Sequence, residues 1–190
     1  MGGKVAPRVA AAEPSVAGLV LLAGDTQPMP QAVVRIVRYL ASLDPGPAAE
    51  AAVEIITRQA AMADSPDLSP DTPAAELPFG YSGAYVLDLR DYDPVASAAA
   101  LDKPMLILQG GRDYQVTVAD DLSPWRERLG HRPGVAIRVY DADDHMFFPG
   151  SGPSAPADYQ APQDVDAADI ADWLAPRQNR IARLFAGFTR

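Results

Sequence analysis

The sequence predicts an α/β fold, a parallel sheet with flanking helices, in a single domain that spans residues 1–190. Two short runs, residues 16–23 and 105–108, are apolar along their whole length, which is typical of parallel strands buried on both faces. A third run, residues 135–140, alternates enough between apolar and polar side chains to be a strand. Segments with helical periodicity lie before and between these runs, and strands that alternate with helices favour a parallel sheet.

The composition narrows the class of protein. Acidic residues outnumber basic ones by 25 to 16, which gives a net charge of −9, so the surface would repel nucleic acid and we expect no nucleic-acid partner. Cysteine is absent, which excludes disulfides and thiolate sites, and the two histidines, His131 and His145, form no metal-binding motif. We therefore expect no metal and no cofactor. No apolar run reaches the roughly 20 residues of a membrane-spanning helix.

The first residues predict a helix over 2–13. Pro7 is tolerated because it lies near the first turn, and Glu13-Pro14 ends the helix. The segment has neither the charged start nor the apolar core of a signal peptide, so the cytoplasm is the default compartment. Secretion stays open if the true N-terminus lies upstream, and the sequence does not indicate an oligomeric state.

Residues 27–92 predict an insertion into the α/β domain. Two segments, 32–43 and 48–62, are helical by periodicity, and residues 65–78 are rich in proline, serine and aspartate. Residues 85–94 then carry the chain back toward the sheet. An insertion of this length without a strand signal suits a helical cap or lid over a site. The alternative is a peripheral helical layer.

Three further helices are expected, over residues 95–101, 117–129 and 165–174. Thr117 is the predicted N-cap of the second, and Pro124 is expected to kink or restart that helix. The basic tail, residues 177–190, has some amphipathic spacing, which predicts a helical extension or, as an alternative, a partner-binding segment.

Asp113 and His145 are the candidate catalytic residues. Asp113 follows strand 105–108 after a glycine pair, at the carboxyl end of the strand, where open α/β sheets place their ligands. Taken alone, Asp113 has a second interpretation, in which it caps the next helix or pairs with Arg112. His145 follows strand 135–140, so both residues are expected at the same sheet edge. A carboxylate that holds one ring N–H of an imidazole lets the other nitrogen accept a proton from a serine.

Other residues compete for these roles. Ser82 lies in G-Y-S-G-A, which is close to a nucleophile elbow, but an alanine replaces the closing glycine and we expect neither a strand before it nor a helix after it. Asp143 and Asp144 are rival acids, although neighbours of a histidine in a short loop rarely reach its ring nitrogen. We expect His131 to be an exposed turn residue.

Five segments in order carry a resemblance to a known family: V-A-G-L-V-L-L-A-G (16–24), Y-V-L-D-L-R-D-Y-D-P (85–94), P-M-L-I-L-Q-G-G-R-D-Y-Q-V (104–116), Y-D-A-D-D-H-M-F-F (140–148) and D-I-A-D-W-L (169–174). Together they resemble the α/β-hydrolase superfamily, and particularly its bacterial esterase-like and dienelactone-hydrolase-like members. The start, M-G-G-K, is similar to the second half of a nucleophile elbow with the serine just before Met1.

The resemblance implies a partial α/β-hydrolase fold, its carboxyl-terminal portion, with a catalytic triad. Asp113 would be the acid and His145 the general base, and the backbone N–H of Met1 would be a donor to the oxyanion. The implied activity is serine-dependent hydrolysis of carboxylic esters or related small acyl substrates. Because the serine is missing, we expect the chain by itself to be inactive. The alternative is a truncated or degenerate, non-catalytic relative that binds a small ligand or a partner.

Overall fold

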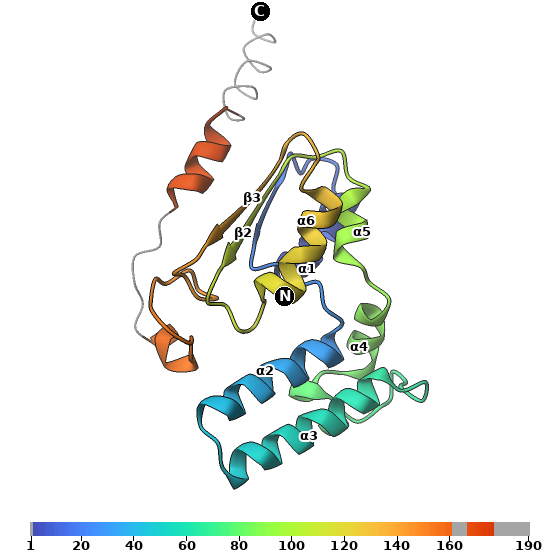
Figure 1. Ribbon diagram of the computed structural model, residues 1–190. Coiled ribbons are helices and arrows are strands. Elements are labelled where there is room, and N and C mark those ends of the chain that lie inside the picture. The colour runs from blue at the N-terminus through green and yellow to red at the C-terminus, as the bar shows by residue number, and fades with distance from the viewer. Residues whose placement is uncertain (1, 161–166, 177–190) are drawn as a thin grey trace, which may run out of the picture.

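A computed structural model describes residues 2–160 and 167–176 of the chain. At its centre is a three-stranded parallel sheet in the order β1-β2-β3 (Figure 1). The strands are β1 (Leu19–Leu22), β2 (Met105–Gly110) and β3 (Val135–Tyr140). The predicted α/β class is confirmed, and the sheet with its flanking helices is consistent with part of an α/β-hydrolase fold.

Helices cover both faces of this sheet. One face packs against α1 (Gly2–Ala12), α5 (Pro94–Ala99) and α6 (Ser123–Leu129). The other face packs against a helix at residues 168–176, whose Trp173 lies on the cluster around Leu106 and Leu108. Every residue of β2 is buried, as its apolar sequence predicts for a central strand between two layers of helices.

The first strand is shorter than the apolar run that predicts it. We expected residues 16–23, but β1 begins at Leu19, which pairs with Met105. The residue before Met105 is Pro104, which has no N–H to extend the ladder, although its carbonyl accepts from the N–H of Leu19 at 3.0 Å. The length of β1 is therefore set by its partner strand.

Pro124 divides the helix that was predicted over residues 117–129. The chain forms a π-helical turn, η3 (Val118–Leu122), before α6 begins at Ser123. Thr117 is the N-cap, as expected, and its side chain accepts from the N–H of Asp120. Pro124 cannot donate to the carbonyl of Asp120, and that carbonyl instead accepts from the side chain of Gln27 at 2.8 Å.

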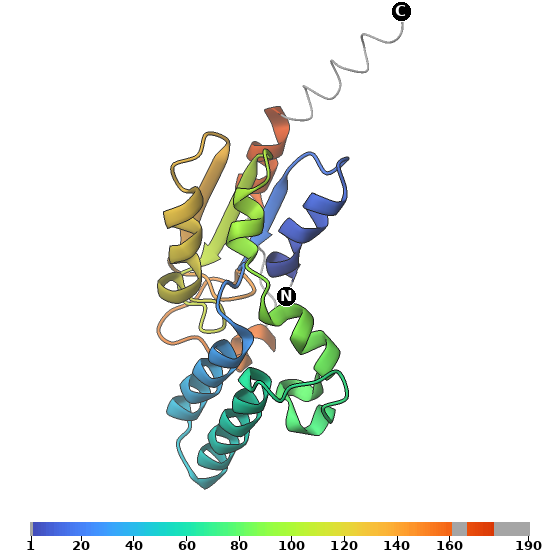
Figure 2. The same cartoon turned by 90° about the vertical axis from the view of Figure 1, so that its right-hand side faces the viewer.

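Residues 27–92 are helical. They contain α2 (Met29–Leu43), α3 (Pro47–Asp64), α4 (Gly83–Arg90) and the 3₁₀ turns η1 (Ala74–Glu76) and η2 (Pro78–Gly80). All residues of this range are described, and none is in a strand. Figures 1 and 2 agree that α2, α3 and α4 lie beyond the end of the sheet toward which the strand arrows point.

The expectation that no helix follows Ser82 was wrong. Helix α4 begins at Gly83, and the Ser82 side chain caps it by accepting from the N–H of Tyr85 at 3.3 Å. The segment that was expected to carry the chain back to the sheet, residues 85–94, is thus mainly this helix. Its polar and apolar residues lack a clear helical period, which is why the sequence pattern did not predict it.

The remaining boundaries need small corrections. Helix α5 covers Pro94–Ala99 rather than 95–101, a 3₁₀ turn, η4 (Pro156–Gln160), lies in the loop after β3, and the last helix is seen at 168–176. The predicted start of that helix at residue 165 and the tail 177–190 lie outside the described residues. Within residues 2–160 and 167–176, no helix has the length and apolar character needed to cross a membrane.

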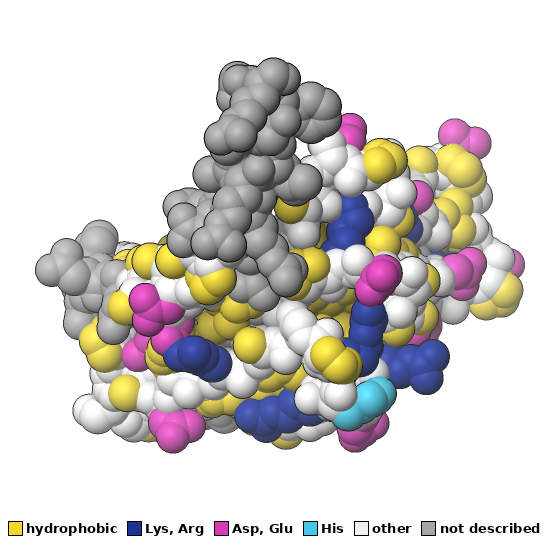
Figure 3. Space-filling model, turned by 90° about the horizontal axis from the view of Figure 1, so that it is seen from above, with side chains coloured by type: hydrophobic (Ala, Val, Ile, Leu, Met, Phe, Trp, Pro, Cys, Tyr) yellow, Lys and Arg dark blue, Asp and Glu magenta, His cyan; other side chains and the backbone are white. Residues whose placement is uncertain are grey.

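The amino edge of the sheet has a mixed surface. Figure 3 views this end from above, and on its visible part basic, acidic and hydrophobic side chains alternate without a field of one charge. Asp113 and His145, the candidate catalytic residues, lie at the opposite, carboxyl edge, where β2 and β3 end.

Candidate functional site

The end of β2 brings Asp113 to the carboxyl edge of the sheet. Beyond Gly110 the chain makes a tight turn that is fixed to the loop after β3. The N–H of Gly111 donates to the carbonyl of Tyr140 at 2.8 Å, and that of Arg112 donates to the carbonyl of Asp143 at 2.8 Å. Asp113 follows this turn and is 4% exposed.

The Asp113 carboxylate is held by hydrogen bonds on both oxygens. Oδ1 accepts from the backbone N–H of Gln115 at 2.8 Å and of Val116 at 2.9 Å. Oδ2 lies 2.8 Å from Nδ1 of His145 and also accepts from Nε2 of Gln109 at 3.3 Å. The backbone contacts fix the carboxylate plane, and one oxygen is left to face the imidazole.

His145 is carried by a turn that rests directly on β2. A Cβ added to Gly110 would lie 2.3 Å from the carbonyl oxygen of Asp144 and 2.7 Å from that of Asp143, so only glycine allows the turn to approach this closely. Within the turn, Phe147 has a positive φ of 61°. The carboxylate of the buried Asp144 accepts from the N–H of Met146 and of Phe148.

The pair has the geometry of a general base with its orienting acid. An ionised carboxylate only accepts hydrogen bonds, so Asp113 selects the tautomer in which Nδ1 of His145 carries the proton. Nε2 is then the acceptor. The His145 side chain is 27% exposed, whereas that of Asp113 is 0% exposed. The arrangement can remove a proton from a group beside Nε2 and later return it.

Gln109 is a residue of the site that the sequence interpretation missed. It is 1% exposed, and its Nε2 donates to the carboxylate of Asp113 and to the carbonyls of Gly110 and Val116. The signal was present, because a lone amide at the end of a wholly apolar strand must find buried partners. Gln109 therefore holds both ends of the acid loop, residues 110–116.

The other interpretations of the acid, namely Asp143 or Asp144 as the acid and an Arg112–Asp113 pair, are not supported by the observed contacts. Arg112 pairs with Asp158 at 3.3 Å rather than with Asp113. Burial raises the pKa of Asp143, and the nearby Asp144 raises it further. Asp144 uses one oxygen within its own turn. Of the candidate acids, Asp113 is the one whose carboxylate meets the His145 ring.

The other candidates are placed as follows. Ser82 caps α4. His131 is exposed in the turn before β3, as the sequence predicts. Met1, the predicted oxyanion donor, lies outside the described residues. Within residues 2–160 and 167–176, no group of three or more His, Asp or Glu side chains is arranged to hold a metal ion.

Helix α1 begins at this same edge, beside the end of β1. A Cβ on Gly3 would lie 2.8 Å from the Cα of Gly24, so the first turn of α1 packs directly on the chain that leaves β1. Lys4, which is 3% exposed, donates from Nζ to Asp25 at 2.9 Å and to the carbonyl of Gln27 at 2.7 Å. The first turn of α1 therefore lies at the carboxyl end of β1, the strand that pairs with β2.

Three stacked tyrosines join the helical segment to the site. Tyr114, next to Asp113, stacks on Tyr39 of α2 at 4.9 Å and on Tyr159 of η4 at 6.1 Å between ring centroids. Tyr39 also donates to the carbonyl of Ser154 at 2.7 Å. Burial raises the pKa of the Tyr159 phenol, which accepts from the side chain of Gln115 at 3.1 Å. The acid loop is thus enclosed by α2 on one side and η4 on the other.

Comparison with known proteins gives a similarity that covers most of the chain. No family model matches the chain. The chain is similar to Esterase EstD of Thermotoga maritima, with 33% identity over 178 residues, which cover 92% of this chain and 40% of that protein. The chain therefore spans less than half the length of this relative.

Proposed function

We propose that the chain carries the acid and the general base of a serine-dependent ester hydrolase of the α/β-hydrolase superfamily. The observation that supports it most is the 2.8 Å contact between Oδ2 of Asp113 and Nδ1 of His145 at the carboxyl edge of a parallel sheet. The similarity to an esterase over 92% of the chain supports the same activity. The substrate class is small carboxylic esters or related acyl compounds.

In this proposal the nucleophile is a serine immediately before Met1. Helix α1 starts beside the end of β1, as a helix that follows a nucleophile elbow would. The backbone N–H of Met1 would then be one of the donors to the oxyanion. The relative is considerably longer than this chain, which is compatible with further strands and the serine on the part that the similarity does not cover.

The proposed reaction uses His145 twice. Nε2 takes the proton of the serine hydroxyl as its oxygen attacks the ester carbonyl, and the alcohol leaves with that proton when the C–O bond breaks. Water then attacks the acyl-serine and gives its proton to Nε2, and the carboxylic acid leaves as serine regains its proton. Asp113 stabilises the imidazolium at both stages.

The proposal gives residues 27–92 the role of a cap. Helices α2 to α4 lie beyond the carboxyl ends of the strands, on the side of the catalytic pair. Tyr39 and Arg35 of α2 both reach the loop that follows Asp113. A cap in this position would cover the acyl group and exclude water from the reaction.

The test is labelling with a fluorophosphonate probe, which reacts with activated serines. The 190-residue chain should not be labelled, whereas the product of a reading frame that continues upstream into a G-x-S elbow should be labelled at that serine. Labelling of the 190-residue chain that disappears with Ser82→Ala would make Ser82 the nucleophile and overturn the proposal. A stop codon directly upstream would instead favour the non-catalytic alternative.

A further inference from the structure

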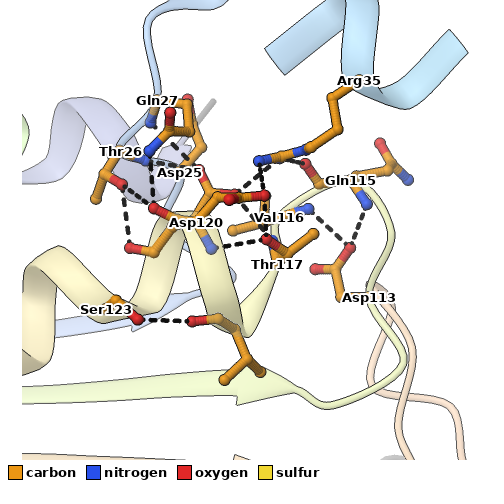
Figure 4. Close-up of polar contacts among 12 residues, drawn as sticks. Asp25, Thr26, Gln27, Arg35, Asp113, Gln115, Val116, Thr117, Asp120 and Ser123 are labelled. Atoms are coloured by element: carbon orange, nitrogen blue, oxygen red, sulfur yellow. Dashed lines mark hydrogen bonds and ion pairs between the residues drawn. The ribbon is translucent and has the colours of Figure 1, made fainter. Parts of the chain in front are cut away.

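Arg35 extends from the helical segment to the loop that carries Asp113. Figure 4 shows its side chain leaving α2 and reaching Gln115, next to the contacts of the Asp113 carboxylate. Arg35 Nη2 donates to the carbonyl oxygen of Gln115 at 2.8 Å. The side chain is 25% exposed, so this contact is partly shielded from water.

The contact falls on the peptide group that also holds the acid. The carbonyl of Gln115 and the N–H of Val116 belong to one planar peptide unit. That N–H donates to Oδ1 of Asp113 at 2.9 Å, while the carbonyl accepts from Arg35. A cation on the carbonyl fixes the tilt of the plane and polarises the N–H at its other end, which strengthens the bond to the carboxylate.

Arg35 is itself held by two carboxylates. Nη1 donates to Oδ2 of Asp120 at 2.8 Å, and Nη2 donates to Oδ2 of Asp121 at 2.8 Å. Asp121 is 0% exposed and also accepts from three backbone N–H groups, those of Thr26, Gln27 and Thr117.

Asp121 thus joins three parts of the chain. Thr26 and Gln27 lead into the helical segment, Thr117 closes the acid loop, and Arg35 lies on α2. A planar guanidinium that satisfies two carboxylates and a carbonyl at once has one orientation, and a lysine ammonium cannot reproduce it.

We infer that Arg35 is a positioning residue for Asp113 and that it acts through the Gln115–Val116 peptide. Through Arg35, the position of helix α2 affects the strength of the hydrogen bond between Asp113 and His145. The inference rests on the proposed function, because it concerns the acid assigned there. It adds a role for a residue of the proposed cap whose hydrogen bonds go to Gln115, Asp120 and Asp121.

The test measures the His145 ring proton directly. In the 190-residue chain labelled with ¹⁵N-histidine, the 2.8 Å contact with Asp113 should protect the Nδ1–H of His145 from exchange, whereas His131 is exposed and should give the unprotected reference. Exchange of the Nδ1–H with water should become about tenfold faster in Arg35→Met, a size usual for coupled neighbouring residues. Arg38→Met, an exposed arginine on the same helix, should leave it unchanged.

Backbone amides of β2 separate this effect from a general loss of stability. If Arg35→Met speeds exchange of His145 Nδ1–H and of the Leu106 amide by the same factor, Arg35 is merely structural and the inference is overturned. If Arg35→Met does not fold, Arg35→Lys serves, since it keeps the positive charge beside Asp121. It should speed Nδ1–H exchange more than Leu106 exchange, and an unchanged Nδ1–H would overturn the inference.

Asp113→Asn distinguishes the inference from the proposed function. If it removes the protection of His145 while Arg35→Met and Arg35→Lys do not, the catalytic pair stands and the role of Arg35 is refuted. If Asp113→Asn leaves the protection intact, the pair is not coupled in solution, and both the proposed function and the inference fail.

Discussion

Asp113 and Asp121 make the same kind of buried site with different partners. Both side chains are 0% exposed, and each carboxylate accepts from two backbone N–H groups on Oδ1, while Asp121 accepts from a third, that of Thr117, on Oδ2. On the other oxygen, Asp113 meets the ring of His145 and Asp121 meets the guanidinium of Arg35. Because backbone N–H groups hold both carboxylates in a similar way, the two acids differ mainly in the side chain that each one meets.

The side chain that pairs with each buried carboxylate determines whether the pair can transfer a proton. His145 is 27% exposed, and its ring has a second nitrogen, Nε2, beside the one that faces Asp113. The guanidinium of Arg35 donates hydrogen bonds and has no acceptor atom, so its pair with Asp121 can only hold segments together. Comparing the two shows that burial and hydrogen bonding of an acid do not by themselves indicate catalysis.

The largest effect on stability is expected at the Asp121 site. Asp121→Asn removes the charge that compensates Arg35 in a buried setting, and we expect a loss of about 3 kcal/mol in the free energy of unfolding. Urea unfolding measures it. Asp120→Asn is the matched control, because the Asp120 side chain is 49% exposed and its pair with Arg35 should contribute less than about 1 kcal/mol. Equal losses in the two variants would contradict the comparison.

A smaller loss of stability is expected where the turn that carries His145 rests on Gly110 of β2. In Gly110→Ala the new methyl group would meet the backbone of Asp144 at 2.3 Å, which must move. We expect about 1–3 kcal/mol of destabilisation, as for other overpacked sites, and weaker protection of the His145 ring proton. Gly2→Ala is the control, since nothing lies within 4 Å of its added Cβ. A Gly110→Ala variant with unchanged stability would show that the turn that carries His145 is not in direct contact with β2.

The smallest effect is expected at a second arginine link to the helical segment. Arg8 of α1 pairs with Asp88 of α4 at 2.6 Å and lies 4.1 Å from the ring of Tyr92, but the Arg8 and Asp88 side chains are 42% and 60% exposed. Arg8→Met should cost about 0.5–1 kcal/mol in urea unfolding, and the ion-pair part of this difference should shrink at about 1 M salt. If Arg8→Met lost as much stability as Asp121→Asn, solvent exposure would not explain the difference between the Arg8–Asp88 and Arg35–Asp121 ion pairs.

The sequence alone predicted the class of the fold and placed Asp113 and His145, which lie 2.8 Å apart in the structure, at one edge of the sheet. The wholly apolar run at 105–108 predicted β2, which extends two residues further to Gly110, and β3 was predicted with its observed bounds, 135–140. Because the carboxyl ends of neighbouring parallel strands meet at one edge, the positions of Asp113 and His145 followed from the order of the elements. Both are local signals, carried by a few residues at the ends of strands.

The contacts between distant segments could not be predicted in the same way. Nothing near Arg35 indicates that it meets Gln115, 80 residues away along the chain. Helix α4 was missed because its pattern is not periodic, and its start depends on the Ser82 cap. The start of β1 depends on Pro104, which immediately precedes the neighbouring strand β2. These features arise from tertiary packing, which overrides local preference.

The most direct test of the central claim is the turnover of a p-nitrophenyl ester by the enzyme that includes the serine proposed before Met1. His145→Ala should lower kcat by at least about a thousandfold, because the general base is lost. His131→Ala, which changes an exposed turn residue, should leave kcat unchanged. A His145→Ala enzyme that is folded and retains its turnover would contradict the assignment of Asp113 and His145 as the catalytic pair.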